Sequence, residues 1–148
     1  MRPAINVGLS VSRVGGAAQL GAMKQTAGQL RMDLAQYREL ASFAQFGSDL
    51  DQATRKTLHR GERMTEILKQ KQYHPMSATD QIIIIFAASH GYCDDIEVAD
   101  IARFETELIA YVHKNDPELT DAVCSGKKLD KAAIGRLSQT IEAFKKLF

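Results

Sequence analysis

Apolar residues recur at alternating intervals of three and four from Leu20 onward, a pattern that predicts amphipathic helices. Gly28 lies inside the first such run and costs a helix about 1 kcal/mol relative to Ala, so we expect a break or kink there. Gly47 is a natural left-handed cap and should end this helix. The inner face is expected to comprise Leu20, Met23, Ala27, Leu30, Leu34, Tyr37, Ala41 and Ala44.

A second helix is predicted to follow at once and to run to about Lys69. Ser48 and Asp51 stand three residues apart and form an approximate capping box at its start. Tyr73-His74-Pro75 then interrupts the pattern, because a residue before proline avoids helical torsion angles. The inner positions of this second helix would be Leu50, Ala53, Thr57, Leu58, Met64, Ile67 and Leu68.

The segment from Asp80 to His90 is locally ambiguous. Ile82–Phe86 has strong β propensity, but Ser77 or Thr79 can cap a helix before it and Gly91 can end one after it. No partner strand appears nearby, so the sequence favours a buried helix whose isoleucines lie in the core.

Two further helical runs complete the pattern. The first carries Ile101, Phe104, Leu108, Tyr111 and Val112 on one face, and Pro117 marks its end or the start of the next turn. The second begins near Asp130 and carries Ile134, Leu137, Ile141, Phe144 and Phe148. We therefore predict an all-α bundle over residues 20–148, preceded by an irregular or strand-forming arm over residues 1–19.

Composition limits the classes of function. Lys and Arg number 19 against 18 Asp and Glu, so the chain is no polycation built to neutralise phosphates. Its 45% hydrophobic residues suffice for a core, and with four Tyr, six Phe and no Trp it lacks a surface of stacked rings for single-stranded nucleic acid. The spacing of Cys93 and Cys124 is not that of a disulfide framework, which favours a reducing compartment. No apolar run is long enough to span a bilayer, and the amino terminus lacks a signal-peptide pattern.

Common site motifs are absent. Gly126-Lys127 is followed by Lys128, so no phosphate-binding loop forms around it. His90 and Cys93 have the spacing of two zinc ligands, but no second pair completes four. The acidic pairs Asp94-Asp95 and Asp49/Asp51 adjoin predicted helix starts, where capping is their expected role.

One arginine stands out. Arg13 lies between apolar residues and the pair Gly15-Gly16, just before the first helix. It is either an ordinary solvated side chain on a connecting turn or a guanidinium that a glycine-containing turn holds toward a polyanion.

Several segments together resemble the α subunits of F-type ATP synthases. The resemblance runs through the chain in order and covers only the carboxyl-terminal third of such a subunit, namely the last piece of the nucleotide-binding domain (1–19) and the helical domain (20–148). The amino-terminal β-barrel and the phosphate-binding loop are not in this sequence. The matching segments are Arg2–Gly8, Ser10–Gln19, Leu34–Glu39, Phe43–Asp51 and Leu68–Met76.

The resemblance implies roles for single residues. Arg13 matches the arginine finger that reaches in trans into the catalytic site of a neighbouring β subunit. Arg2, Pro3, Gln70 and Gln72 match residues around the adenine of a non-catalytic nucleotide; apart from the resemblance, Gln70 and Gln72 would be a polar helix end. ATP or ADP would bind with Mg²⁺ in the full assembly, and only weakly to this chain alone, since the phosphate-binding loop is missing.

The resemblance also implies the setting. Residues 45–51 match a turn that faces the central γ shaft. The chain would belong to an α3β3 head peripheral to a membrane, where ATP synthesis or hydrolysis is coupled to proton transport, and it would not be catalytic alone. The alternative is a free-standing helical interaction module with no nucleotide role.

Overall fold

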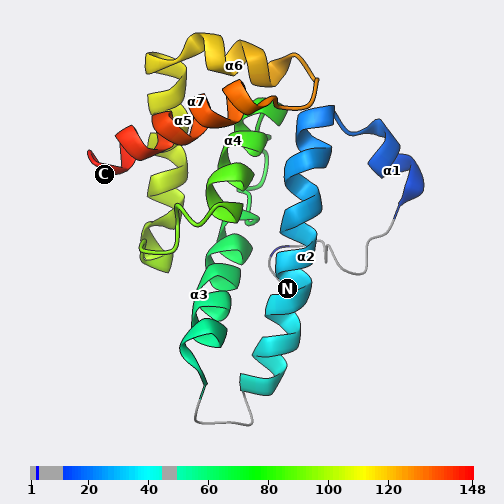
Figure 1. The fold of residues 1–148 in the computed structure, drawn as a ribbon, viewed down its shortest axis with the longest axis vertical. Helices are drawn as coiled ribbons and strands as arrows, with labels where there is room; N and C mark the ends of the chain where they lie inside the picture. The colour runs from blue at the N-terminus through cyan, green and yellow to red at the C-terminus, as the bar shows by residue number, and fades with distance from the viewer. Residues whose placement is uncertain (1–2, 4–11, 45–49) are drawn as a thin grey trace.

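The computed structural model describes residue 3 and residues 12–44 and 50–148, and over these ranges it is helical without strands (Figure 1). The all-α prediction is therefore confirmed. The elements are α1 (Arg13–Ala18), α2 (Gly21–Ala44), α3 (Gln52–Ile67), α4 (Ala78–Ser89), the short 3₁₀ helix η1 (Val98–Asp100), α5 (Ile101–Asn115), α6 (Pro117–Cys124) and α7 (Lys131–Lys145).

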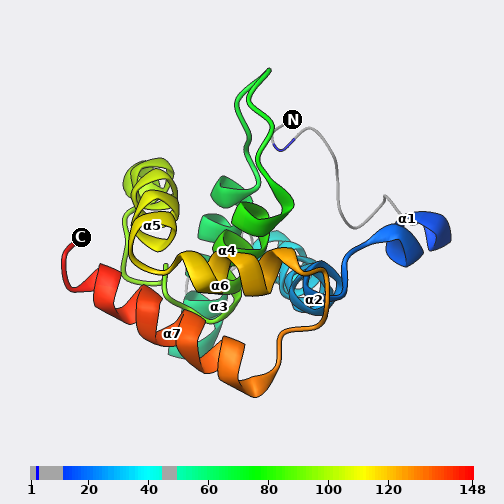
Figure 2. The ribbon, with the colours of Figure 1, turned by 90° about the horizontal axis from the view of Figure 1, so that it is seen from above.

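The helices pack around α4. Helices α2 and α3 lie side by side along the length of the molecule, α4 continues from α3, and α6 and α7 cross the end of the bundle (Figures 1 and 2). Helix α4 contacts α2, α3, α5, α6 and α7. A helix covered on so many sides exposes little of its middle turns to solvent.

The core reflects this arrangement. Every residue from Ile82 to Ala88 is buried, which is why this stretch shows no helical alternation of apolar and polar residues. Burying one isoleucine side chain stabilises a fold by about 1.5–3 kcal/mol, so the four in succession account for much of the packing energy of α4. The choice of a buried helix over a strand is confirmed.

Local capping signals locate three of the helices. The carboxylate of Asp51 accepts a hydrogen bond from Thr54 N (2.9 Å), Ser77 Oγ accepts one from Asp80 N (3.1 Å), and Asp130 accepts one from Ala133 N (2.7 Å). These bonds satisfy backbone donors that a helix start leaves free. Ser48 and Gly47 lie outside the described residues.

Some boundaries differ from the prediction. Helix α2 passes through Gly28 without a break, because packing of the buried Leu30 and Leu34 in the next turns outweighs the roughly 1 kcal/mol that a helical glycine costs. Helix α3 ends at Ile67 rather than near Lys69. Ala53, expected inside, is exposed.

The segment before α2 also differs. Instead of an irregular or extended arm, Arg13–Ala18 forms α1, whose start is capped by Ser12 Oγ accepting from Gly15 N (2.9 Å). The cap supplies a local partner for a backbone donor, so one helical turn forms despite two glycines. None of the residues of α1 is buried.

The capping role expected for Asp94 and Asp95 is wrong. Both lie in the turn after α4 and form ion pairs with other elements, Asp94 with Arg60 of α3 and Asp95 with Lys145 of α7 at 2.5 Å. The buried Arg63 adds a hydrogen bond from Nε to the Ile96 carbonyl (2.8 Å). This turn is therefore held by charge-assisted bonds from two helices.

No helix in the described part of the chain is long and apolar enough to cross a membrane. Both cysteines are free thiols, Cys93 buried and Cys124 exposed. The described residues contain no cluster of His, Cys, Asp or Glu suited to a metal ion.

Candidate functional site

Arg13 occupies the first position of α1, a helix that stands away from the bundle (Figures 1 and 2). Its side chain is exposed and makes no hydrogen bond or ion pair with any described residue. Val14, the next residue, is 79% exposed. The guanidinium is thus available to a charge outside this chain.

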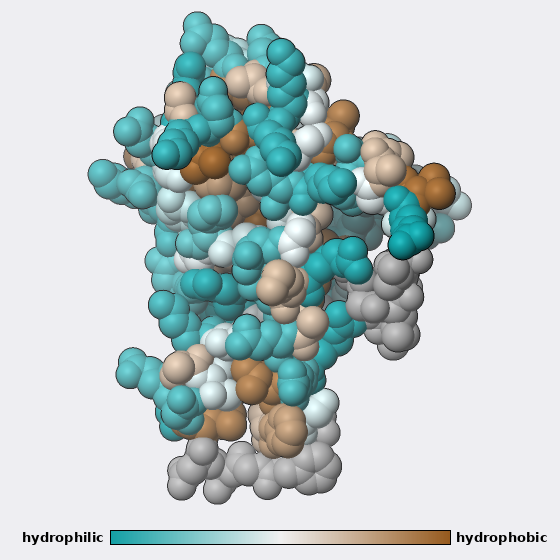
Figure 3. All heavy atoms as spheres, turned by 45° about the vertical axis from the view of Figure 1, so that its right-hand side comes forward, coloured by the Kyte–Doolittle hydropathy of each residue, from teal (hydrophilic) through white to brown (hydrophobic). Residues whose placement is uncertain are grey.

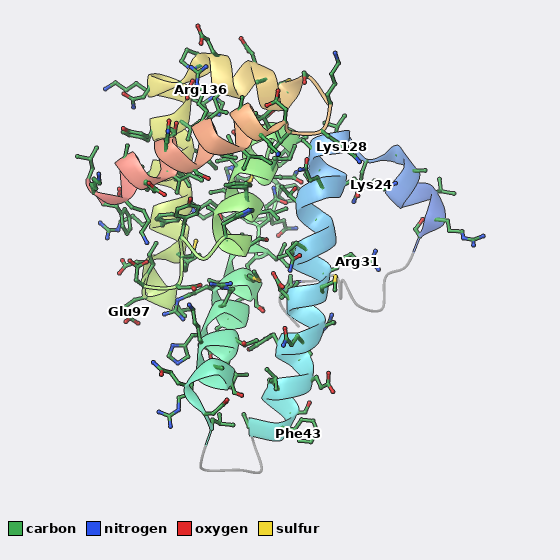
Figure 4. The ribbon with its side chains drawn as sticks, viewed as in Figure 1. Lys24, Arg31, Phe43, Glu97, Lys128 and Arg136 are labelled. Atoms are coloured by element: carbon green, nitrogen blue, oxygen red, sulfur yellow. The ribbon has the colours of Figure 1, made fainter. Side chains whose placement is uncertain are left out.

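The surface from which α1 departs carries further positive charge. Lys24 and Lys128 lie near the amino-terminal end of α2 (Figure 4), where Gly21 N donates to the Gly126 carbonyl at 2.7 Å. The close approach of the two backbones brings the turn after α6 beside the start of α2. Such clustered cations favour an anionic partner.

Gln70 and Gln72 lie in the connection between α3 and α4, a loop that projects from the helical body (Figure 2). Both are exposed. Gln70 Nε2 donates to the His74 carbonyl at 2.8 Å, and His74 N donates to the Lys71 carbonyl at 3.3 Å. These two bonds lie within the loop and close it into a compact turn. Gln72 lies inside this turn in the sequence, and its side chain is exposed to solvent.

Tyr73 gives this loop an unusual feature. It has a φ of 61°, a left-handed conformation that costs a bulky residue energy, and it is 90% exposed. An exposed ring on a strained backbone gains nothing from this chain's own core. Among the residues that the structure describes, Tyr73 is the only one other than glycine with a positive φ.

The structure does not bring the candidate residues into one site. Helix α1, with Arg13, stands to one side of the bundle, whereas the loop with Gln70 and Gln72 projects from it in another direction (Figure 2). Pro3 is half-buried, and Arg2 lies outside the described residues. Two separate candidate surfaces result, each built around exposed polar groups.

Elsewhere the surface is ordinary. The face in Figure 3 is dominated by hydrophilic residues, with hydrophobic ones in small scattered groups. One hollow of about 340 Å³ lies between α2 and α3 and is lined by Asp33, Lys56 and Arg60 among others. Another of about 230 Å³ is lined by residues that include Gln25, His90 and Leu129. Neither includes Arg13, Gln70 or Gln72.

Comparison with known sequences decides the family. Residues 19–144 match the family described as the ATP synthase alpha/beta chain, C terminal domain. The chain belongs to this family. The matched range of this ATP synthase domain contains helices α2 to α7, except for the last residue of α7, and the loop with Gln70 and Gln72. Helix α1, which carries Arg13, precedes the matched range.

Individual relatives extend the match over the whole chain. It is 54% identical over 148 residues to the ATP synthase subunit alpha of Wolinella succinogenes, covering 100% of this chain and 30% of that protein. It is 54% identical over 145 residues to that of Desulfovibrio desulfuricans (98% and 29%), and 51% identical over 148 residues to that of Aquifex aeolicus (100% and 29%). The chain thus spans about 30% of the length of these ATP synthase subunits.

Sequence patterns missed two features of the structure. Asp94 and Asp95 pair with residues 34 and 50 positions away, a separation for which local spacing gives no signal. Glu105 follows the buried Phe104 and is half-buried beside the Gln70 loop, although its place at the edge of an apolar stripe is typical of a solvated residue.

Proposed function

We propose that this chain acts as the carboxyl-terminal part of an ATP synthase alpha subunit, in which its helical domain packs within the catalytic head. The observation that carries the proposal is the 51–54% identity, along the chain, to proteins named ATP synthase subunit alpha. In this proposal residues 1–19 belong to the nucleotide-binding domain and residues 20–148 form the helical domain. Beta and gamma subunits are the partners, and the head is peripheral to a membrane and coupled to proton transport.

Arg13 is proposed to act in trans on a nucleotide that a beta subunit binds. A guanidinium is always charged and donates several hydrogen bonds, so it can stabilise the negative charge that develops on the phosphoryl oxygens. Its exposure on α1, without a partner among the described residues, supports this role. Such arginine fingers contribute on the order of 10³–10⁵ in rate.

The test uses a complete alpha subunit assembled with its beta and gamma partners. Arg13→Ala should lower ATP turnover by several orders of magnitude while assembly is retained, and Arg13→Lys should also fail because an ammonium cannot reproduce the planar fork. Lys131→Ala, an exposed change on α7, is the control and should retain turnover. Near-normal turnover of Arg13→Ala would remove Arg13 from the catalytic assignment.

A second role is proposed for the α3–α4 loop. Gln70 and Gln72, with Arg2 and Pro3, would contact the adenine of a non-catalytic ATP or ADP, since glutamine amides can pair with the edge of the base. The phosphates and Mg²⁺ would be bound by groups that this sequence does not contain. Calorimetry with the 148-residue chain should therefore detect no millimolar-range binding of ATP, and tight binding would point to another pocket.

A further inference from the structure

A small hollow lies between the end of α3, the α3–α4 loop, α4 and α5. Its volume is about 130 Å³. The walls are largely apolar and comprise Ile67, Leu68, Met76, Ile84 and Ile85, of which the three isoleucines are at most 8% exposed. A hollow of this kind accepts methylene groups.

Each of the two glutamines that line the hollow donates one hydrogen bond to a backbone carbonyl. Gln70 Nε2 donates to the His74 carbonyl (2.8 Å), and Gln81 Nε2 donates to the Met76 carbonyl (2.9 Å). Each amide therefore has its carbonyl oxygen left for another partner. As lining residues, both glutamines can offer this oxygen, and a second N–H donor, to an occupant of the hollow.

Glu105 adds a negative charge to the same lining. It is half-buried and makes no hydrogen bond or ion pair with any described residue. Burial raises the pKa of its carboxyl group, with the charge of Lys71 acting in the opposite direction. Lys69, which also lines the hollow, is paired with Glu66. A half-buried carboxylate without a bonded partner is costly, and a cation beside it would offset that cost.

We propose that this hollow binds the side chain of an arginine that a partner polypeptide presents, with the guanidinium facing Glu105 and the oxygens of Gln70 and Gln81. An arginine fits this lining because its methylenes contact the apolar walls while its planar head supplies five donors to a set of acceptors. A lysine ammonium is a compact point charge and matches the three separate acceptors less well.

The size of the hollow favours a side chain over a metabolite. Pockets for small molecules have volumes of about 300–1,000 Å³, and this hollow has about 130 Å³. Its place beside the exposed, strained Tyr73 loop also puts it where an outside chain can reach it. The inference shares Gln70 with the adenine contact proposed above, but it does not depend on that contact.

The test is a titration of the 148-residue chain with Nα-acetyl-arginine amide at pH 7, followed by NMR of ¹³C-labelled methionine methyl groups. Met76 lines the hollow and should shift, whereas Met32 on α2, which is 70% exposed and contributes nothing to the lining, should not. Glu105→Gln should weaken the apparent affinity at least tenfold. The fully buried Met64 reports whether this variant keeps its core.

Matched probes separate the alternatives. Nα-acetyl-citrulline amide has the same length without the charge and should leave Met76 unchanged; Nα-acetyl-lysine amide should bind more weakly. The proposal is overturned if Met76 does not respond to the arginine probe, if citrulline acts equally, or if Glu105→Gln binds as well as the parent. Tighter binding of free L-arginine would indicate a small-molecule site instead. If an Arg2→Ala variant binds the arginine probe more tightly than the parent chain does, Arg2 of this chain would be the occupant instead of an arginine from a partner.

If Glu105→Gln perturbs Met64, Gln81→Leu provides a second variant, because it removes one acceptor from α4 and keeps the apolar wall. It should weaken binding of the arginine probe while the spectrum of Met64 stays that of the parent. Unchanged affinity in this variant, with the core intact, would contradict the role assigned to the Gln81 oxygen and with it the three-acceptor site.

Discussion

Arg60 of α3 forms a bidentate ion pair with Asp94, in which Nε donates to Oδ1 at 3.0 Å and Nη2 donates to Oδ2. The pair fixes the turn after α4 to α3. Gly91 in the same turn has a φ of +81°, and a Cβ there would lie 2.5 Å from Arg60 Nη2. The arginine thus occupies space that a side chain at position 91 would need.

Asp94→Asn should destabilise the chain by about 1–3 kcal/mol, because a bidentate, charge-assisted pair is replaced by a neutral amide that cannot accept with both atoms. Urea denaturation at pH 7 measures the loss. Asp121→Asn serves as the control, because Asp121 is exposed on α6 and forms no ion pair with any described residue; this change should shift stability by less than about 0.5 kcal/mol. Equal effects of the two changes would remove the special role of the pair.

Two helical glycines should respond to alanine in opposite directions. A Cβ at Gly61 would lie 2.2 Å from ring atoms of Tyr37, where α2 and α3 pack closely, so Gly61→Ala should destabilise by about 1–3 kcal/mol. A Cβ at Gly28 meets nothing within 4 Å. Gly28→Ala should therefore stabilise by about 0.5–1 kcal/mol, as the helix propensity of alanine predicts. Thermal unfolding of both variants checks the contrast, which the same sign of change would contradict.

The two thiols should differ in reactivity. Burial raises the pKa of Cys93 to about 12, from an ordinary value of 9.0, whereas Cys124 is exposed at the end of α6. The thiolate is the reactive form, so Cys93 should be inert at pH 8. A disulfide reagent should therefore titrate one thiol in the folded chain and two in denaturant. A Cys124→Ser variant should show no fast reaction, and a fast reaction there would mean that Cys93 is accessible.

Protonation of the Asp116 carboxylate should make the free energy of unfolding depend on pH in the acid range. It starts α6, where its carboxylate accepts from Leu119 N at 3.1 Å and from Arg136 Nε at 2.8 Å. Burial raises its pKa, but the bonds from Arg136 and the Leu119 backbone outweigh burial and lower the pKa below the ordinary 3.8. Its stabilising contribution is therefore full above pH 3.8 and is lost as pH falls through the lower folded value.

Asp116→Asn isolates that charge, because asparagine is as good a helix cap as aspartate. The variant should unfold at lower urea concentration than the parent at pH 7, and the difference between the two should shrink as the pH falls below the ordinary pKa of 3.8 in urea titrations. Asp130→Asn caps α7 in the same way but removes no ion pair, so it should cost less at pH 7. A pH-independent difference between Asp116→Asn and the parent would contradict the assignment to charge.

Local signals predicted much of the fold. Ser77, one of the two caps that the sequence offers for α4, is the cap in the structure. The capping box expected from Ser48 and Asp51 places the cap at Ser48, whereas Asp51 itself caps α3, which starts at Gln52. Asp130 lies at the expected start of α7 and caps it. From the sequence, Pro117 marks either the end of a helix or the start of the next turn. In the structure it is the first residue of α6, which Asp116 caps. The pattern alone does not separate these two uses of a proline.

Features that depend on distant contacts could not be predicted in this way. Asp94 was assigned to a cap because its partner, Arg60, is visible only once α3 and the turn after α4 are placed together. The candidate roles of Arg13, Gln70 and Gln72 came from family resemblance rather than from periodicity. Glu105 was missed because its half-burial depends on how the α3–α4 loop folds back near α5.

The hydrogen bonds at the start of α2 have a consequence for biosynthesis. Gly21 N donates to the Gly126 carbonyl, and the Gln25 side chain bonds with the backbone of Leu129, 104 positions away. During translation the beginning of α2 leaves the ribosome early, yet these backbone partners are made only after most of the bundle. The start of α2 therefore lacks these hydrogen-bond partners until that part of the chain has been made. A nascent chain stalled before residue 126 should remain open to proteases at that end, however completely α3 and α4 have already packed.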